Sequence, residues 1–160
     1  MVRARSRLAV VAALVVVVFG GCGGGGDGRA DLDPDTARFS YGERAVVVPL
    51  AECGRDGDVV LAAGQLDAVV LQVAADVGGG GVDRSAVTVD LGDDGVWGAF
   101  GADASVGPGP AGEITGVAVD GDVVTVDGRW ARLDGELRPD PGQPPMEGRV
   151  QARCPGAAAA

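Results

Sequence analysis

The sequence predicts a mostly β domain, a small antiparallel β-sandwich stapled by one disulfide bond. Short runs of Val, Ala and Leu are bounded by Gly, Asp and Pro, which is typical of strands joined by tight turns. At residues 86–91 (AVTVDL) apolar and polar residues alternate, as expected for a strand with one face in the core. Asp-Gly pairs at 120–121, 127–128 and 134–135 are hairpin-type turn signals.

The apolar runs predict nine strands in chain order. We place them at 44–50, 58–63, 67–75, 86–91, 96–100, 114–119, 122–127, 129–133 and 147–153. The segment 66–77 also carries apolar residues at helical spacing, so one short helix is the alternative there. The glycine-rich stretches at 78–81 and 107–112 are predicted loops.

The N-terminus has the composition of an export signal. Three arginines precede an apolar run from Leu8 to Phe19, which is followed by Gly20 and Gly21. A basic segment, an apolar stretch and small residues are the parts of a cleavable signal peptide. The apolar run is shorter than the roughly 20 residues of a membrane-spanning helix. We therefore predict that 1–21 are a signal peptide.

The residues Phe19-Gly20-Gly21-Cys22 resemble the lipobox of bacterial lipoproteins, although the family usually has an aliphatic residue where Phe19 stands. The resemblance implies cleavage before Cys22 and acylation of that cysteine, for example with palmitate. The protein would then be attached to the extracytoplasmic face of the cell membrane. The alternative is an ordinary secreted protein in which Cys22 is a free thiol.

The cysteine count supports this interpretation. Three cysteines in an exported chain leave one unpaired. If Cys22 carries lipid, Cys53 and Cys154 remain as a natural pair in an oxidising compartment. Their disulfide would close a loop of about 100 residues and contribute roughly 4–5 kcal/mol to stability on the chain-entropy model.

The mature chain divides into three parts. Residues 22–38 contain the lipidated cysteine and a Gly/Asp-rich segment that predicts a flexible tether. Residues 39–154 form the β-rich domain. Residues 155–160 are small and predict a disordered tail.

The composition excludes most enzymes and nucleic-acid binders. The chain has no histidine, which is the commonest general base and transition-metal ligand, and no lysine. Its net charge of −10 opposes binding to phosphate backbones. Asp90, Asp93 and Asp94 are better explained as a polar turn than as a cation site. We predict no catalytic residue, no metal site, no cofactor and no nucleic-acid partner.

Large rings are scarce in the predicted domain, so Trp97, Phe100 and Trp130 are conspicuous. The simpler interpretation is that they fill a core otherwise built from Val and Ala. The alternative is that they line an apolar pocket able to hold a lipid or another apolar molecule.

Several segments resemble the mycobacterial nineteen-kilodalton lipoprotein antigen family. They are DVVLAAG (58–64), AVTVDLG (86–92) and VAVDGDVVTVDGRWARLDG (117–135), followed by a proline-rich turn and a last strand that ends at Cys154. The short Gly/Asp tether departs from the longer Ser/Thr-rich tether of that family. The resemblance implies a cell-envelope lipoprotein without enzymatic activity, a surface antigen-like interaction or structural module bound to the membrane through its acylated N-terminus. The alternative function is a carrier with an apolar ligand in its β domain.

Overall fold

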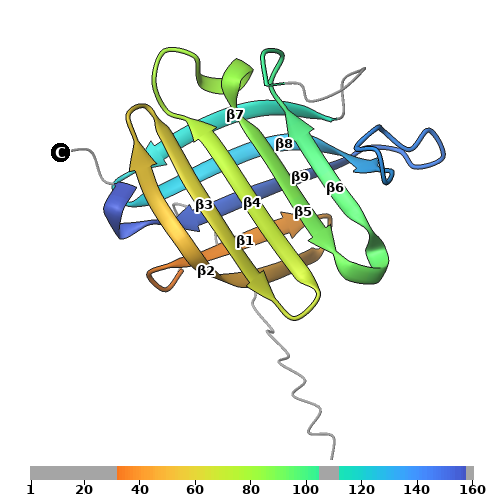
Figure 1. Cartoon of the computed structure of the whole chain (residues 1–160), viewed down its shortest axis with the longest axis horizontal. Helices are drawn as coiled ribbons and strands as arrows, with labels where there is room; N and C mark the ends of the chain where they lie inside the picture. Colours follow the sequence, from red (N-terminus) through yellow and green to blue (C-terminus); the bar gives the residue numbers. More distant parts are fainter. Residues whose placement is uncertain (1–31, 105–111, 158–160) are drawn as a thin grey trace, which may run out of the picture.

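The computed structural model describes residues 32–104 and 112–157, which form antiparallel strands around one core (Figure 1). The strands are β1 (Thr36–Tyr41), β2 (Arg44–Asp56), β3 (Val59–Leu66), β4 (Val69–Asp76), β5 (Ala86–Leu91), β6 (Val96–Phe100), β7 (Glu113–Asp120), β8 (Val123–Leu133) and β9 (Met146–Arg153). Short 3-10 helices follow three of them: η1 (Gly81–Arg84), η2 (Gly92–Asp94) and η3 (Pro155–Ala157). In the part of the chain that the structure describes, no helix is long and apolar enough to cross a membrane.

Eight of the strands close into an antiparallel barrel, so the predicted sandwich is wrong although the predicted β class is confirmed. The hydrogen-bonded order is β6-β5-β4-β3-β2-β1-β9-β8, and β6 pairs with β8 to complete the ring. The remaining strand, β7, is added to β8 outside the ring. An eight-stranded barrel is just wide enough for its own side chains to fill.

The barrel closes because β2 and β8 each change partners along their length. The first half of β2, up to Pro49, pairs with β1. The rest pairs with β3, and this second pairing contains a bulge between Leu50 and Glu52. Strand β8 pairs with β9 from Val123 to Trp130 and with β6 from 131 to 133. Bulged strands that pass from one sheet to another turn the corners of such folds. The two expected layers are therefore one continuous wall.

The predicted turn at Asp127-Gly128 is also wrong, because both residues lie inside β8. The predicted strands 122–127 and 129–133 are thus a single strand. Gly128 is buried, and a Cβ added there would lie 2.8 Å from the carbonyl oxygen of Glu113 and 3.2 Å from Cβ of Ala99. The glycine serves a close approach of neighbouring strands rather than a change of chain direction.

The ambiguous segment 66–77 is a strand, and the alternative helix does not form. Leu66 ends β3, and β4 runs over most of the remaining segment. Asp67 and Ala68 make the turn between the two strands, with Asp67 in the left-handed region (φ +53°). The other predicted strands are confirmed, with β2 six residues longer at its C-terminal end than predicted.

The folded part begins earlier than predicted. Leu32 is buried, and β1 starts at Thr36, inside the predicted tether 22–38. At the other end, η3 occupies the start of the predicted disordered tail. The predicted signal peptide, Cys22, residues 22–31 of the tether, 107–111 of the second predicted loop and 158–160 of the tail lie outside the described residues.

The barrel interior is filled by inward-facing side chains, and its two largest are Trp130 and Phe39, both fully buried. Their ring centroids are 5.0 Å apart and the rings are perpendicular, at 73°. Tyr41 stacks on the other side of Phe39, also at 5.0 Å. The indole of Trp130 occupies the space where Gly148 has no side chain. Branched residues complete the core: Val48, Val60, Leu71, Val87, Val89, Ile114, Val124, Val126 and Val150.

Candidate functional site

The structure does not bring Trp97, Phe100 and Trp130 into one pocket. Trp130 is fully buried and belongs to the hydrophobic core, which supports the core-filling interpretation for this residue. Trp97 is paired in register with the buried Val89 and faces inward at one end of the barrel. Phe100 is three positions after Trp97 on β6, so its side chain lies on the opposite side of the strand, the outer face of the barrel.

Phe100 borders a groove on the outside of the barrel. The residues Leu61, Ala74, Ala86 and Phe100 are successive partners in one register row across β3, β4, β5 and β6. The two alanines form a shallow floor between the larger side chains, and Leu137 adds a further apolar side chain. The resulting space, the outer groove, has a volume of about 420 Å³.

A larger hollow lies at the end of the barrel where Trp97 faces inward. It is bordered by the β1–β2 turn, the β5–β6 turn and the loop between β8 and β9. We call this hollow, of about 740 Å³, the mouth. The residues that matter most for its chemistry are Tyr41, Arg44, Asp94, Trp97, Arg132 and Met146.

The mouth has an aromatic floor. Tyr41 lines it and stacks on Phe39, which in turn packs on the edge of Trp130. Phe39 and Trp130 are fully buried, so Tyr41 is the member of this ring cluster that lines the mouth. The indole N–H of Trp97 donates to the backbone carbonyl of Asp94 at 3.1 Å, which fixes the ring at the side of the hollow.

The two arginines of the mouth differ in their surroundings. Arg44 forms an ion pair with Asp94 at 3.4 Å, and both side chains are more than half exposed. Arg132 is half-buried and packs against Gly95, where an added Cβ would lie 2.8 Å from the guanidinium Nε. Within the described residues, the guanidinium of Arg132 has no hydrogen bond and no ion pair.

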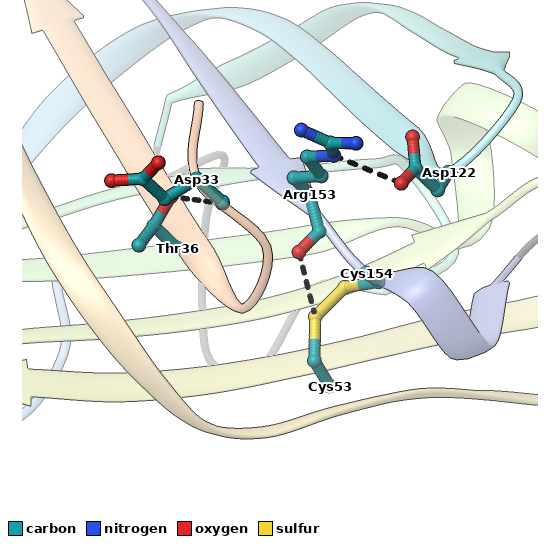
Figure 2. The surroundings of a disulfide bond; sticks show 6 residues. All are labelled: Asp33, Thr36, Cys53, Asp122, Arg153 and Cys154. Atoms are coloured by element: carbon teal, nitrogen blue, oxygen red, sulfur yellow. Dashed lines mark hydrogen bonds and ion pairs between the residues drawn. A yellow bond between two sulfur atoms is a disulfide. The ribbon is translucent and has the colours of Figure 1, made fainter. Parts of the chain in front are cut away.

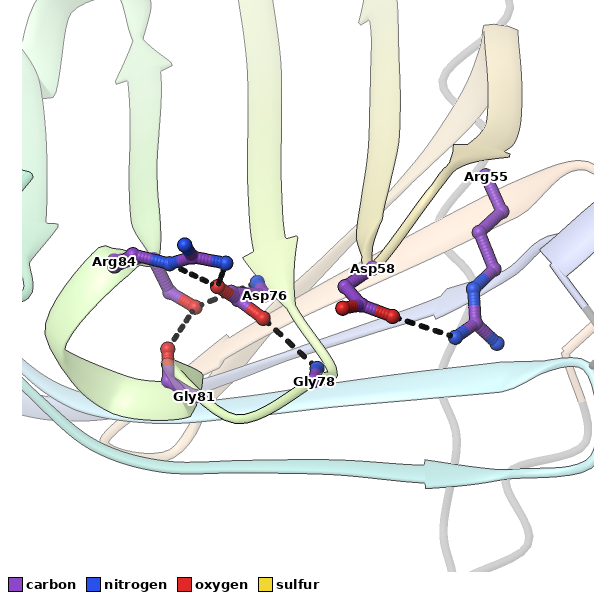
Figure 3. A network of polar contacts seen from close by, with 7 residues as sticks. Arg55, Asp58, Asp76, Gly78, Gly81 and Arg84 are labelled. Carbon is purple, nitrogen blue, oxygen red and sulfur yellow. Dashed lines mark hydrogen bonds and ion pairs between the residues drawn. The ribbon is translucent and has the colours of Figure 1, made fainter.

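The opposite end of the barrel holds a buried carboxylate, Asp76, at the end of β4 (Figure 3). Its side chain accepts a hydrogen bond from the backbone N–H of Gly78 at 2.8 Å and is paired with the guanidinium of Arg84. The Gly78 N–H, together with Arg84, lowers the pKa of Asp76 despite the opposing effect of burial. Both oxygens of this carboxylate are engaged, so the arrangement is a structural clamp.

Ser85 connects the same clamp to the backbone. Its hydroxyl donates to the carbonyl of Gly81 at 2.8 Å and accepts from the backbone N–H of Asp76 at 2.8 Å. Ser85 is fully buried. No histidine exists in the chain to activate it, and both hydrogen bonds hold η1 against β4.

The disulfide between Cys53 and Cys154 is confirmed and joins β2 to the residue after β9, with the Cα atoms 5.3 Å apart (Figure 2). The backbone N–H of Cys154 donates to the carbonyl of Asp122 at 2.7 Å. The neighbouring Arg153 donates to the Asp122 carboxylate at 2.9 Å and to the carbonyl of Leu32 at 2.8 Å. The hydrogen bond from Arg153 lowers the pKa of Asp122. This cluster ties the first described residue to the last strand.

The polar turn predicted around Asp90, Asp93 and Asp94 contains η2. Asp90 accepts a hydrogen bond from the backbone N–H of Gly92 at 2.9 Å, which is an Asx-type turn contact. Among residues 32–104 and 112–157, no group of three or more His, Cys, Asp or Glu side chains is placed to hold a metal ion.

Most residues of the mouth were not predictable from the sequence. Tyr41 and Arg132 are more than 90 positions apart and become neighbours only through barrel closure. One signal was present: Arg132 interrupts the apolar face of β8, two positions after the fully buried Trp130. The closed barrel explains this interruption, because Arg132 lies at the end of the barrel and lines the mouth.

No protein-family model matches the chain, and a search of curated proteins finds no match.

Proposed function

We propose that the protein is a non-enzymatic lipoprotein of the cell envelope, held at the extracytoplasmic face of the membrane by an acylated Cys22. The observation that carries the proposal is the use of the three cysteines. Cys53 and Cys154 are joined, which leaves Cys22 as the one cysteine outside the bridge. A structural disulfide between distant strands suits an oxidising compartment. The resemblance to the mycobacterial nineteen-kilodalton lipoprotein antigen family supports the same proposal.

The early start of the folded part adds a spatial argument. Since Leu32 is already buried in the domain, only residues 23–31 are left to connect it to Cys22. Nine residues span at most about 30 Å when fully extended. The barrel would therefore be held close to the membrane, as a surface module for interactions within the envelope.

Membrane fractionation of cells producing Cys22→Ala tests this proposal. The variant should move from the membrane to the soluble fraction and lose the mass added by acylation. The double variant Cys53→Ser/Cys154→Ser is the matched control, because it removes two cysteines and should stay in the membrane. If Cys22→Ala stays there too, the apolar run 8–19 is an uncleaved anchor and the proposal is wrong.

The second candidate function is a carrier of a lipid or another apolar small molecule, and the mouth favours it. Ligand pockets have volumes of roughly 300–1,000 Å³ and combine apolar and aromatic side chains with a few polar groups. The mouth, of about 740 Å³, places Tyr41, Trp97 and Met146 beside charged residues. Native mass spectrometry of the protein purified from its own envelope would detect a co-purifying ligand. A protein without added mass would favour the interaction module.

A further inference from the structure

We propose that the mouth binds a small organic monocarboxylate with an apolar body, and that Arg132 receives the carboxylate group. This inference rests on the carrier function and deepens it, because it names the chemical class of the ligand and the residue that selects it. It combines three features of the mouth: an arginine without a partner among the described residues, three apolar or aromatic side chains beside it, and an acidic rim.

The first feature is the state of Arg132. It stands on β8 in register with Trp97 on β6, so its side chain faces the same end of the barrel interior. It is half-buried and, among the described residues, has no acceptor for its guanidinium. A guanidinium offers a planar set of donors that matches the two oxygens of a carboxylate. The contrast with Arg44, whose charge is matched by Asp94, singles out Arg132.

The second feature is the apolar lining beside Arg132. Tyr41 is fixed by stacking on Phe39, and Trp97 is fixed by the hydrogen bond of its indole N–H to Asp94. Met146, the first residue of β9, adds an adaptable side chain. A ligand that enters this hollow meets two rings that are already held in place, so little conformational entropy of these side chains is lost on binding.

The third feature is the negative charge of the rim. Glu43, Asp93 and Asp94 all line the mouth and are exposed, whereas Arg132 lies deeper. The guanidinium of Arg132 compensates one negative charge on a ligand, whereas these carboxylates repel any further ones. A monocarboxylate satisfies both conditions. Phosphates and polycarboxylates of similar size carry charges that would face the acidic rim.

Photo-crosslinking with two matched probes tests the inference on the full-length protein in phosphatidylcholine nanodiscs. The probes are para-benzoylbenzoate and its neutral counterpart para-methylbenzophenone. Excited benzophenones react readily with methionine, and Met146 lies in the mouth, while Met1 is the other methionine of the chain. Peptide mapping reports the labelled residue, and the dependence of yield on probe concentration gives the Kd.

We expect saturable labelling of Met146 by the carboxylate, with a Kd about tenfold lower than that of the neutral probe, because only the carboxylate accepts charge-assisted hydrogen bonds from the Arg132 guanidinium. Arg132→Gln should remove this difference, and Arg132→Lys, which keeps the charge, should restore part of it. Arg55→Gln, which removes a paired arginine at the opposite end of the barrel, is the matched control and should change the Kd less than about twofold.

Two outcomes would overturn the inference, and they are distinguishable. Equal labelling by both probes, or an Arg132→Gln variant with unchanged affinity for the carboxylate, contradicts the role of Arg132 while leaving the mouth as a binding site. Absence of saturable labelling at Met146 with either probe contradicts the carrier function as well. Membrane attachment through Cys22 is independent of both results.

Discussion

Asp76 and Arg84 form an ion pair between the end of β4 and η1, in which the carboxylate is completely buried and the guanidinium is 54% exposed. The pair lies at the end of the barrel opposite to the mouth. Because the Gly78 backbone N–H binds the same carboxylate, its charge is compensated from two directions. The ionised form of Asp76 is thus part of the folded structure.

This arrangement predicts a specific loss of stability in acid. The pKa of Asp76 in the folded protein is lowered from its usual value of 3.8, first by the Gly78 N–H and then by Arg84. The stabilisation is therefore fully present above pH 3.8 and is lost as the pH falls through the lowered pKa. Asp76→Asn should make the acid side of the stability curve shallower and lower the free energy of unfolding at neutral pH, as measured by denaturant titration.

The matched control for this prediction is Asp58→Asn. Asp58 lies at the same end of the barrel, pairs with Arg55 at 3.7 Å and has a side chain that is 64% exposed. Its replacement should leave the acid limb close to that of the wild type. Some loss of stability in acid should remain in Asp76→Asn. Hydrogen bonds also lower the pKa values of Asp122 and Asp134, so these carboxylates contribute to it too. An unchanged limb in Asp76→Asn would contradict the assignment.

Reduction of the Cys53–Cys154 bond should destabilise the barrel strongly. The cysteines are separated by 101 positions, so the bond restricts the unfolded chain over most of the domain. The chain-entropy model gives about 4–5 kcal/mol for such a loop, which corresponds to a fall in Tm on the order of 10–20 °C. Calorimetry with and without reductant measures it. Cys22→Ala should show the same fall, whereas Cys53→Ser/Cys154→Ser should not respond to reductant.

Gly64 should tolerate no side chain. It is buried on β3, and an added Cβ would lie 2.2 Å from the carbonyl oxygen of Pro49, at the bend of β2. Gly64→Ala should therefore cost about 1–3 kcal/mol, as expected for overpacking. Gly54→Ala is the control, because Gly54 on β2 has no atom within 4 Å of the added group. Equal unfolding free energies for the two variants would contradict this prediction. They would mean that the backbone of β2 shifts at its bulge to accommodate the methyl group without loss of stability.

Trp130 combines a large buried ring with a buried N–H that has no hydrogen-bond partner within the described part of the chain. Trp130→Ala should cost about 3–5 kcal/mol through the cavity it leaves. Trp130→Phe should cost less than about 1.5 kcal/mol, because removal of the unpaired N–H offsets part of the lost packing. Fluorescence of Trp97 can follow both unfolding curves. A cost of Trp130→Phe equal to that of Trp130→Ala would contradict the offset expected from removal of the unpaired N–H.

The strands were predictable because their signals are local. Alternation in AVTVDL and the apolar runs of β3 and β4 depend on neighbours along the chain, and the structure confirms them. Barrel closure was not predictable in this way. It depends on β2 and β8, whose partner changes and bulge involve strands far away in the sequence. The same Asp-Gly pair that ends a strand at 120–121 lies within one at 127–128, because only the folded neighbours of Gly128 distinguish the two.

Candidate functional residues could be predicted from the sequence only where the prediction did not depend on the fold. Cysteine parity could pair Cys53 with Cys154 without knowledge of the fold, because only three cysteines had to be assigned. The sequence could not show which of the three aromatic residues face the barrel interior. Phe100 lies on the outer face, because it is three positions after the inward-facing Trp97 on β6. Arg132 gained its significance only from what surrounds it in space.

Strand β1 has a mechanical consequence. It is paired at six positions with β2 and at six with β9, and it runs from the end where the chain enters the barrel to the end where Tyr41 lines the mouth. If the chain is pulled at Leu32 while a partner is held at the mouth, the force acts along the axis of β1. Interstrand hydrogen bonds lie across that axis. Extraction of β1 therefore requires both of its ladders to shear together, and they cannot be peeled apart one bond at a time.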